Sequence, residues 1–231
     1  MLELTGLTTH RRGFLGRLAA GAAALGLGGL VAPAEAAAQP PRGARMVSAN
    51  PEFETWLNKI TGKHKMIYDV PEPNDGLAFA WARVFLNTTN ETYGTTDGDN
   101  TVVIVLRHAG IPFAMKDPMW AKYKFGQMFK ITDPKTHRPA IRNPFANMKP
   151  GAFPIAGVGV DELLSHGVLV GVCNIALTLN AGIVAKKLGK DGAAVKQEWV
   201  ANLFPGVQIA PSGVIAVNRA QEKGCAYCFA G

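Results

Sequence analysis

The alternation of apolar runs and polar turns along this chain predicts a layered α/β fold. Five short runs are rich in β-branched and other apolar residues and are bounded by turn residues, as strands are. They span residues 65–70, 101–106, 168–172, 207–210 and 225–229. The second and third runs are apolar at nearly every position, which is typical of parallel strands buried on both faces.

Helical patterns lie between these runs. Apolar residues recur at helical spacing from Leu77 to about Thr89, and Asp117 followed by proline indicates another helix start. Further helices are predicted at residues 51–60, 156–165, 173–187, 193–204 and 214–223. Strands that alternate with helices imply parallel crossover connections. We therefore expect a single α/β domain with a mostly parallel five-stranded sheet and helices on both faces, layered as in flavodoxin.

The N-terminal segment has the features of an export signal. Arg11 and Arg12 precede Phe14, and a moderately apolar, uncharged run leads to the small-residue site at residues 34–38. This order is typical of a twin-arginine signal. A membrane anchor is the alternative, although several glycines and Pro33 interrupt the apolar run. We expect a periplasmic protein without a membrane span after cleavage.

The rest of the chain divides into a leader and one domain. Residues 1–38 are assigned to the signal, residues 39–62 to a leader with a short helix, and residues 63–231 to the α/β domain. Residues 131–154 are proline-rich and irregular. An insertion of this length inside a compact domain is a candidate lid or oligomer contact.

Composition and motifs exclude several classes of function. The net charge of +7 suits an anionic ligand or an acidic partner, but the basic residues are scattered, so we expect no nucleic-acid binding. The chain has no G-x-S-x-G motif, phosphate-binding glycine loop or paired-carboxylate pattern, which argues against a hydrolase. The histidines are dispersed and have no metal-binding spacing, so their pattern alone predicts no metal site. The sequence leaves the cofactor unknown.

Cys173 is the first candidate for chemistry. It falls at the junction between the strand at 168–172 and the helix that follows. The free N–H groups and the positive dipole end of that helix would stabilise a thiolate and lower the pKa of the thiol. The alternative is a small buried side chain with no reactivity, because free cysteine is often buried.

Arg107 and His108 are expected near this thiol. Both directly follow the strand at 101–106, so they share with Cys173 the carboxyl edge of a parallel sheet, where ligands bind in open α/β folds. Either residue would supply a positive charge or a proton next to the sulfur. Alternatively, His108 only caps a loop.

Three segments of the C-terminal half resemble a known family. They are Val170-Gly-Val-Cys173-Asn-Ile-Ala-Leu177, Gly206-Val-Gln-Ile-Ala-Pro-Ser-Gly-Val214 and Ala220-Gln-Glu-Lys-Gly-Cys-Ala-Tyr227. Their order resembles the DsrE/DsrF-like family of small sulfur-relay proteins. The resemblance extends over residues 63–231 in the order of elements. It implies a compact, mostly parallel α/β domain that assembles into a homo-oligomer. It also implies that Cys173 accepts sulfane sulfur as a persulfide and passes it to a thiol of a partner protein.

Cys225 and Cys228 form a C-x-x-C pair at the end of the chain. The alternation of a strand would place them on opposite faces, which makes a disulfide between them awkward unless the chain turns. A structural or resolving disulfide that includes Cys173, a disulfide within the pair, and a metal site all stay open.

Two functions compete at this stage. The first is a periplasmic sulfur-handling protein with sulfurtransferase-like thiol chemistry at Cys173, supported by Arg107 and His108. The second is a non-catalytic module that binds a small ligand or metal at the His108 edge. The sequence does not decide whether the protein is an enzyme.

The signal assignment predicts that the mature chain begins between residues 37 and 39, because the small-residue site directly follows the apolar run. N-terminal sequencing of the protein from the periplasm measures this. Recovery of membrane-bound protein that retains Arg11 and Arg12 would instead show an uncleaved anchor.

Overall fold

The computed structural model describes residues 50–231. Its strands are β1 (Lys65–Val70), β2 (Thr101–Leu106), β3 (Leu169–Cys173), β4 (Gln208–Ala210) and β5 (Ala226–Phe229). Its α-helices are α2 (Pro51–Leu57), α3 (Leu77–Tyr93), α4 (Asp117–Tyr123), α5 (Phe125–Met128), α6 (Val160–Ser165), α7 (Asn174–Leu188), α8 (Gly192–Ala201) and α9 (Gly213–Glu222). Short 3-10 helices are η1 (Asn74–Gly76), η2 (Asp97–Asp99) and η3 (His108–Ala114). Arg11, Arg12 and the expected cleavage site lie outside the described residues.

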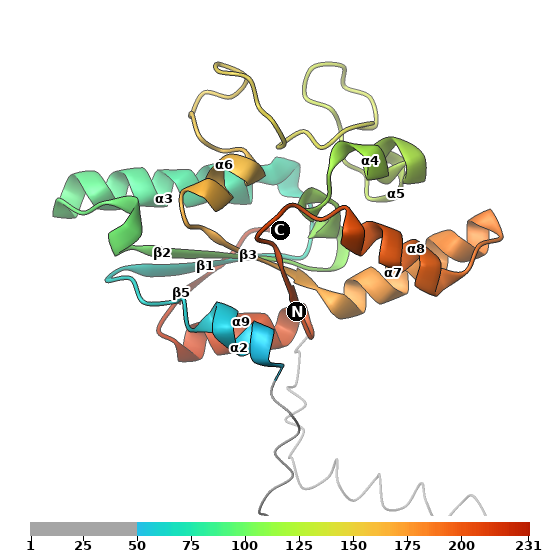
Figure 1. The fold of residues 1–231 in the computed structure, drawn as a ribbon. Helices are drawn as coiled ribbons and strands as arrows, with labels where there is room; N and C mark the ends of the chain where they lie inside the picture. The colour runs from blue at the N-terminus through green and yellow to red at the C-terminus, as the bar shows by residue number, and fades with distance from the viewer. Residues whose placement is uncertain (1–49) are drawn as a thin grey trace, which may run out of the picture. The chain divides into compact units, whose positions relative to one another are not determined.

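The five strands form one parallel sheet in the order β4-β3-β2-β1-β5, which confirms the predicted fold class. The chain moves stepwise across the sheet from β1 to β4. Helix α9 then carries it back across the sheet to β5, which pairs with the outer side of β1 (Figure 1). The carboxyl ends of all strands therefore share one edge.

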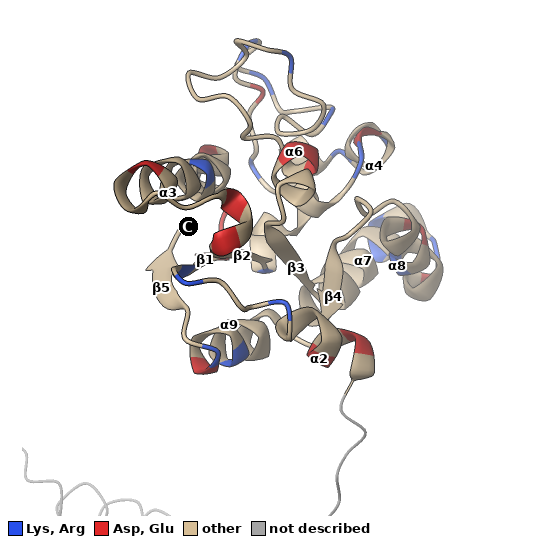
Figure 2. Cartoon of the chain, turned by 60° about the vertical axis from the view of Figure 1, so that its left-hand side comes forward, with Lys and Arg blue, Asp and Glu red and all other residues tan. Residues whose placement is uncertain are grey.

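Each face of the sheet has its own apolar core. Helices α2 and α9 cover one face, called here the α2–α9 face, where Trp56 and Leu57 pack with Ile67, Val103 and Val105. The larger core on the other face, called here the α3 face, includes side chains of α3, α6 and α7. Figure 2 shows α2 and α9 together on one side of the sheet and α3 and α6 on the other.

Helix α2 belongs to the domain core, although the sequence grouped it with the leader. Phe53, Trp56 and Leu57 are all buried. A Cβ added at Gly171 would lie 3.1 Å from Cη2 of Trp56, so the indole rests directly on β3 where glycine leaves room. Among the residues that the structure describes, no helix has both the length and the apolar character needed to cross a bilayer.

The predicted helix at 156–165 begins only at Val160. Gly157 has a φ of +76°, a conformation that ends any regular helix, and the N–H of Gly159 bonds to the carboxylate of Glu162 at the true start. Residues 131–154 contain turns and bends and an isolated bridge between Thr132 and Pro139. Whether they form a lid or an oligomer contact stays a prediction.

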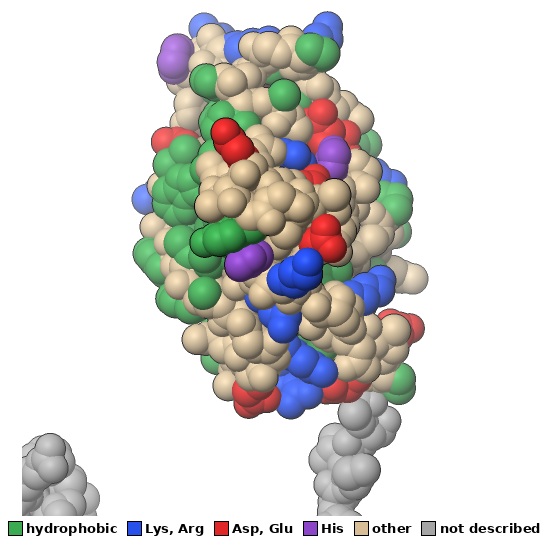
Figure 3. All heavy atoms as spheres, turned by 90° about the vertical axis from the view of Figure 1, so that its left-hand side faces the viewer, with side chains coloured by type: hydrophobic (Ala, Val, Ile, Leu, Met, Phe, Trp, Pro, Cys, Tyr) green, Lys and Arg blue, Asp and Glu red, His purple; other side chains and the backbone are tan. Residues whose placement is uncertain are grey.

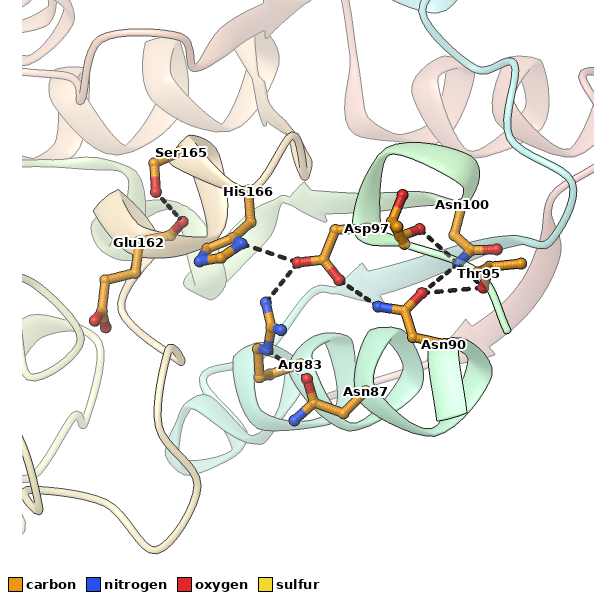
Figure 4. A network of polar contacts seen from close by, with 10 residues as sticks. Arg83, Asn87, Asn90, Thr95, Asp97, Asn100, Glu162, Ser165 and His166 are labelled. Atoms are coloured by element: carbon orange, nitrogen blue, oxygen red, sulfur yellow. Dashed lines mark hydrogen bonds and ion pairs between the residues drawn. The ribbon is translucent and has the colours of Figure 1, made fainter. Parts of the chain in front are cut away.

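A polar network closes the amino edge of the sheet (Figure 4). The carboxylate of Asp97 accepts hydrogen bonds from Arg83 at 2.9 Å and from Asn90 at 2.6 Å, and it lies 2.8 Å from Nδ1 of His166. These contacts join α3, η2 and the end of α6. Burial alone would raise the pKa of Asp97, but the hydrogen bonds from Arg83 and Asn90 and the charge of Arg83 lower it below its ordinary value. Figure 3 shows this side of the molecule, with acidic, basic and histidine side chains interspersed.

This network predicts how stability depends on pH. A carboxyl group with a lowered folded-state pKa stabilises the fold above its unfolded-state pKa, and the stabilisation is lost as the pH falls through the folded-state value. Asp97→Asn should therefore lower the free energy of unfolding by about 1 kcal/mol at pH 7 and by less at pH 3. Urea denaturation at both pH values measures this. The exposed Glu91→Gln is the control, and an equal loss at both pH values would contradict the prediction.

Candidate functional site

Cys173 is the last residue of β3 and the N-cap of α7. Its Sγ accepts a hydrogen bond from the backbone N–H of Ala176 at 3.3 Å. The sulfur therefore occupies the strand–helix junction that the sequence predicts, facing N–H groups that have no partner within the helix. The residue is only 7% exposed.

The sheet topology marks this junction as a binding position. The buried side chains of α7 lie in the core of the α3 face, whereas those of α9 lie in the core of the α2–α9 face. The strands before these helices are neighbours, and Cys173 pairs with Ala210 in the ladder between β3 and β4. Ligands of open α/β sheets bind where neighbouring connections leave toward opposite faces. Cys173 lies at such a point.

Arg107 is fixed by a bidentate ion pair. It follows β2 and faces the α2–α9 face, as does Asp69 near the end of β1. Its Nε lies 2.6 Å from Oδ1 of Asp69, and its Nη2 lies 2.9 Å from Oδ2. The carboxylate is buried, and the arginine side chain is 29% exposed. This fork geometry gives the guanidinium a single orientation.

Two further elements hold the pair. The hydroxyl of Tyr227 on β5 donates a hydrogen bond of 2.9 Å to Oδ2 of Asp69. A Cβ added at Gly213 would lie 2.6 Å from Cβ of Arg107, so α9 begins directly against the arginine stem. The ion pair thus joins β1, β2, β5 and α9 at the carboxyl edge.

The charges at this edge couple to the thiol. The hydrogen bond to Asp69 is the main cause that raises the pKa of Arg107, and a thiolate at Cys173 adds to it in the same direction. Burial, followed by the bond to Asp69, raises the pKa of Tyr227, so its hydroxyl remains a donor near neutral pH.

His108 is turned toward a different strand end. Its Nδ1 lies 2.9 Å from Oε1 of Glu72, which follows β1, and its side chain is 70% exposed. Cys173 ends β3, which lies on the other side of β2. Within the described part of the chain, no hydrogen bond joins His108 to Cys173. Of the two residues, Arg107 is the one that interacts electrostatically with Cys173.

All three cysteines are free thiols. Cys225 is buried in the core of the α2–α9 face, and burial raises the pKa of its thiol to about 11. Cys228 packs against the core of the α3 face instead. The two therefore lie on opposite faces of the sheet, as the strand alternation predicts, and form no disulfide with each other or with Cys173.

Asp69 and Tyr227 are the residues that the sequence analysis missed. A signal for Asp69 was present, since it is a charged residue within an apolar parallel strand and near its carboxyl end. Tyr227 carried no comparable signal, because a tyrosine in a strand is ordinary. Only the pairing of β5 with β1 brings its hydroxyl to Asp69.

Two other features of the described residues, a possible metal site and a surface cavity, do not suggest a second reactive site. Within residues 50–231, His, Cys, Asp and Glu side chains nowhere gather in a group of three or more that would hold a metal ion. A surface cavity of about 600 Å³ lies at the amino edge, away from Cys173, with Leu164, Val168 and Phe204 in its wall. Its charged lining residues are Lys59 and Asp161, and no cysteine or histidine lines it.

Comparison with known proteins leaves the family open. No family model matches the chain, and no curated protein matches it. Among solved structures, the chain is similar to MTH1491, a protein of unknown function from Methanobacterium thermoautotrophicum, with 16% identity and a TM-score of 0.38. The match covers 72% of this chain and 99% of that one.

The hydrogen-bonded cluster of Asp69, Arg107 and Tyr227, called here the Asp69 cluster, predicts that its variants lose stability to different degrees. Tyr227→Phe removes one hydrogen bond and should lower the free energy of unfolding by about 1 kcal/mol. Asp69→Asn leaves the partly buried Arg107 without its counter-charge and should cost more, about 3 kcal/mol. Urea denaturation measures both, with the exposed Tyr93→Phe as the matched control. Equal losses for Asp69→Asn and Tyr93→Phe would show that the cluster does not hold the edge together.

Proposed function

We propose that this protein accepts sulfane sulfur on Cys173 as a persulfide and passes it to the thiol of a partner protein. The observation that carries the proposal is the environment of Cys173. Its sulfur caps a 15-residue helix and couples electrostatically to a guanidinium fixed by Asp69. The thiolate is the form of cysteine that attacks sulfur, and free N–H groups at a helix start and a nearby positive charge are the surroundings in which reactive cysteines are found.

The position of the cysteine in the fold supports the same function. It lies at the point where the connections after β3 and β4 diverge, the usual ligand position in open α/β sheets. The resemblance of the segments around Cys173, Pro211 and Tyr227 to the DsrE/DsrF-like family points to sulfur relay as well. The twin-arginine pattern at Arg11 and Arg12 supports a periplasmic location for this activity.

The charge environment separates Cys173 from Cys225. The two residues are about equally exposed, at 7% and 6%. However, Cys225 lies among apolar side chains that raise the pKa of its thiol to about 11, and Lys65 opposes this only in part. At neutral pH, Cys225 is therefore protonated and a poor nucleophile.

The chemical steps balance without an added oxidant. The Cys173 thiolate attacks the outer sulfur of a persulfide or polysulfide donor. A new S–S bond forms at Sγ as the donor S–S bond breaks, and the donor leaves as a thiolate. In the second step, the thiolate of the partner attacks the outer sulfur and Cys173 departs as a thiolate. Arg107 stabilises negative charge at Cys173 before the first step and after the second.

The test is intact-mass analysis after exposure of the mature protein to polysulfide. Wild-type protein should gain mass in steps of one sulfur atom, and Cys173→Ser should lose this gain entirely. The matched variants Cys225→Ser and Cys228→Ser should retain it. Arg107→Gln should slow uptake about tenfold because the thiolate loses its nearby charge.

The contrary result has a clear meaning. Sulfur that appears only on Cys225 and Cys228, with Cys173 unreactive until the protein is denatured, would move the chemistry to the C-terminal strand. The carboxyl edge would then be a binding site without catalysis.

A further inference from the structure

The net positive charge of residues 50–231 lies in one segment, residues 130–149, called here the basic segment. It contains five Lys and Arg and a single Asp, whereas the other described residues contain fourteen Lys and Arg and fourteen Asp and Glu. Basic residues occur throughout the chain, but outside the basic segment acidic residues balance them. The five cations are all exposed, and they are Lys130, Lys135, Arg138, Arg142 and Lys149.

The basic segment lies at one end of the described domain. In Figure 1 the loops that contain it form the upper end of the drawing, above α3 and α4. Figure 3 is turned about the vertical axis, so its upper end is the same. On the face drawn there, Lys and Arg side chains gather at this end, and the acidic side chains lie lower. The unbalanced charge is therefore concentrated on one surface.

The acidic residue of the segment, Asp133, is buried and does not screen this surface. Its Oδ1 accepts hydrogen bonds from the backbone N–H groups of Lys135 at 2.9 Å and Thr136 at 3.0 Å. Its Oδ2 lies 3.8 Å from Nε of Arg142. Within the described part of the chain, the other four cations form no ion pair, so their charge is available to a partner.

The backbone of the basic segment is held in place by hydrogen bonds and buried anchors. The N–H of Asp133 donates to the carbonyl of Arg138 at 2.8 Å, and the N–H of Ala140 donates to that of Ile131 at 2.9 Å, so the loop folds back on itself. Ile131, Ala140 and Phe145 are buried in the core of the α3 face. The cations are thus presented on a fixed frame.

Ile141 projects from this frame into solvent. It is 72% exposed, although Ala140 before it and Asn143 after it are buried. Nδ2 of Asn143 donates to the carbonyls of Phe113 at 2.9 Å and Met115 at 3.0 Å. Because the backbone on both sides is fixed, the isoleucine stays exposed among the basic residues.

A surface cavity of about 240 Å³ opens beside the loop. Three of the five cations, Lys135, Arg142 and Lys149, line it. Two carboxylates also line it, those of Asp117 and Asp133, and both already accept hydrogen bonds from backbone N–H groups of the loop. The cations are therefore the groups that remain for an anionic ligand.

We propose that the basic segment binds the surface of a bilayer that contains anionic phospholipids. Clusters of Lys and Arg attract anionic headgroups, and an apolar side chain beside them adds affinity when it leaves water. In this arrangement the cations contact the headgroup phosphates, one phosphate enters the cavity, and Ile141 inserts at the interface. The binding is peripheral and does not depend on the sulfur chemistry of Cys173.

The composition of this surface favours a bilayer over an acidic protein. Interfaces between proteins are enriched in aromatic residues and depleted in Lys. Three of the five cations are Lys, and Phe145, the one Phe, Tyr or Trp of the segment, is buried. A bilayer also accepts a single projecting side chain such as Ile141 without a matching pocket.

Cosedimentation of the mature protein with lipid vesicles tests the proposal. Wild-type protein should bind vesicles of phosphatidylcholine that contain about 30% phosphatidylglycerol, and it should not bind vesicles of phosphatidylcholine alone. Raising the ionic strength from about 0.1 to 1 M should weaken binding at least tenfold, because the Debye length falls from about 10 Å to about 3 Å.

The double variant Arg138→Gln/Lys149→Gln tests the charge. It should bind about 25-fold more weakly, because each basic residue near an anionic bilayer contributes about fivefold. The matched control, Lys186→Gln/Lys187→Gln, removes the same charge from exposed positions at the end of α7 and should weaken binding less than about fivefold.

The variant Ile141→Asp tests the apolar contact. It should weaken binding at least tenfold, whereas Leu179→Asp, at a position of α7 that is 63% exposed, should bind as the wild type does. All of the substituted side chains are exposed, so the midpoints of urea denaturation should be those of the wild type.

Three outcomes would overturn the proposal. Absence of wild-type binding to the anionic vesicles at low ionic strength would leave an acidic protein as the partner of this surface. Equal binding to vesicles with and without phosphatidylglycerol would show that charge is not the cause. Binding that both the double variant and Ile141→Asp retain would come from another basic stretch, such as the one with Arg42 and Arg45.

Discussion

The bidentate pair of Arg107 and Asp69 is the interaction on which the carboxyl edge of this protein depends. It satisfies a buried carboxylate and fixes the orientation of the guanidinium, and α9 packs against the aliphatic part of Arg107 at Gly213, where glycine permits close approach. Burying such a pair is favourable only when the geometry is good and the remaining lone pairs are satisfied. Tyr227 meets the second condition. The orientation of the Arg107 guanidinium therefore depends on strands that are far apart in sequence.

Most of the fold follows from the hydrophobic pattern. The apolar runs at 101–106 and 168–172 predicted β2 and β3, which are central strands of the sheet. Cys173 lies at a strand–helix junction because β3 ends at this residue and α7 begins at the next one. The start of α6 was wrong by four residues, because a left-handed glycine at 157 interrupts a stretch that is otherwise compatible with a helix. Local periodicity reports which faces are buried, but it does not report single backbone conformations.

The site was only partly predictable for a related reason. Sharing an edge of the sheet is a property of topology, and it places the ends of β2 and β3 on the same edge. It does not specify the direction of each side chain. Arg107 forms an ion pair with Asp69 on the α2–α9 face, whereas the side chain of His108, the next residue, contacts Glu72. Tyr227 could not be assigned without knowing that β5 pairs with β1.

The pairing of β5 with β1 has a consequence for the order of folding. The four strands from β4 to β1 are linked by stepwise connections, whereas β5 joins its neighbour from the opposite end of the described chain. Closing so long a loop costs chain entropy before any contact repays it. We therefore expect a sheet of four strands to form first, with the Asp69 carboxylate still lacking its tyrosine. The hydrogen bonding around the buried Asp69 carboxylate would then be completed only after most of the sheet has formed.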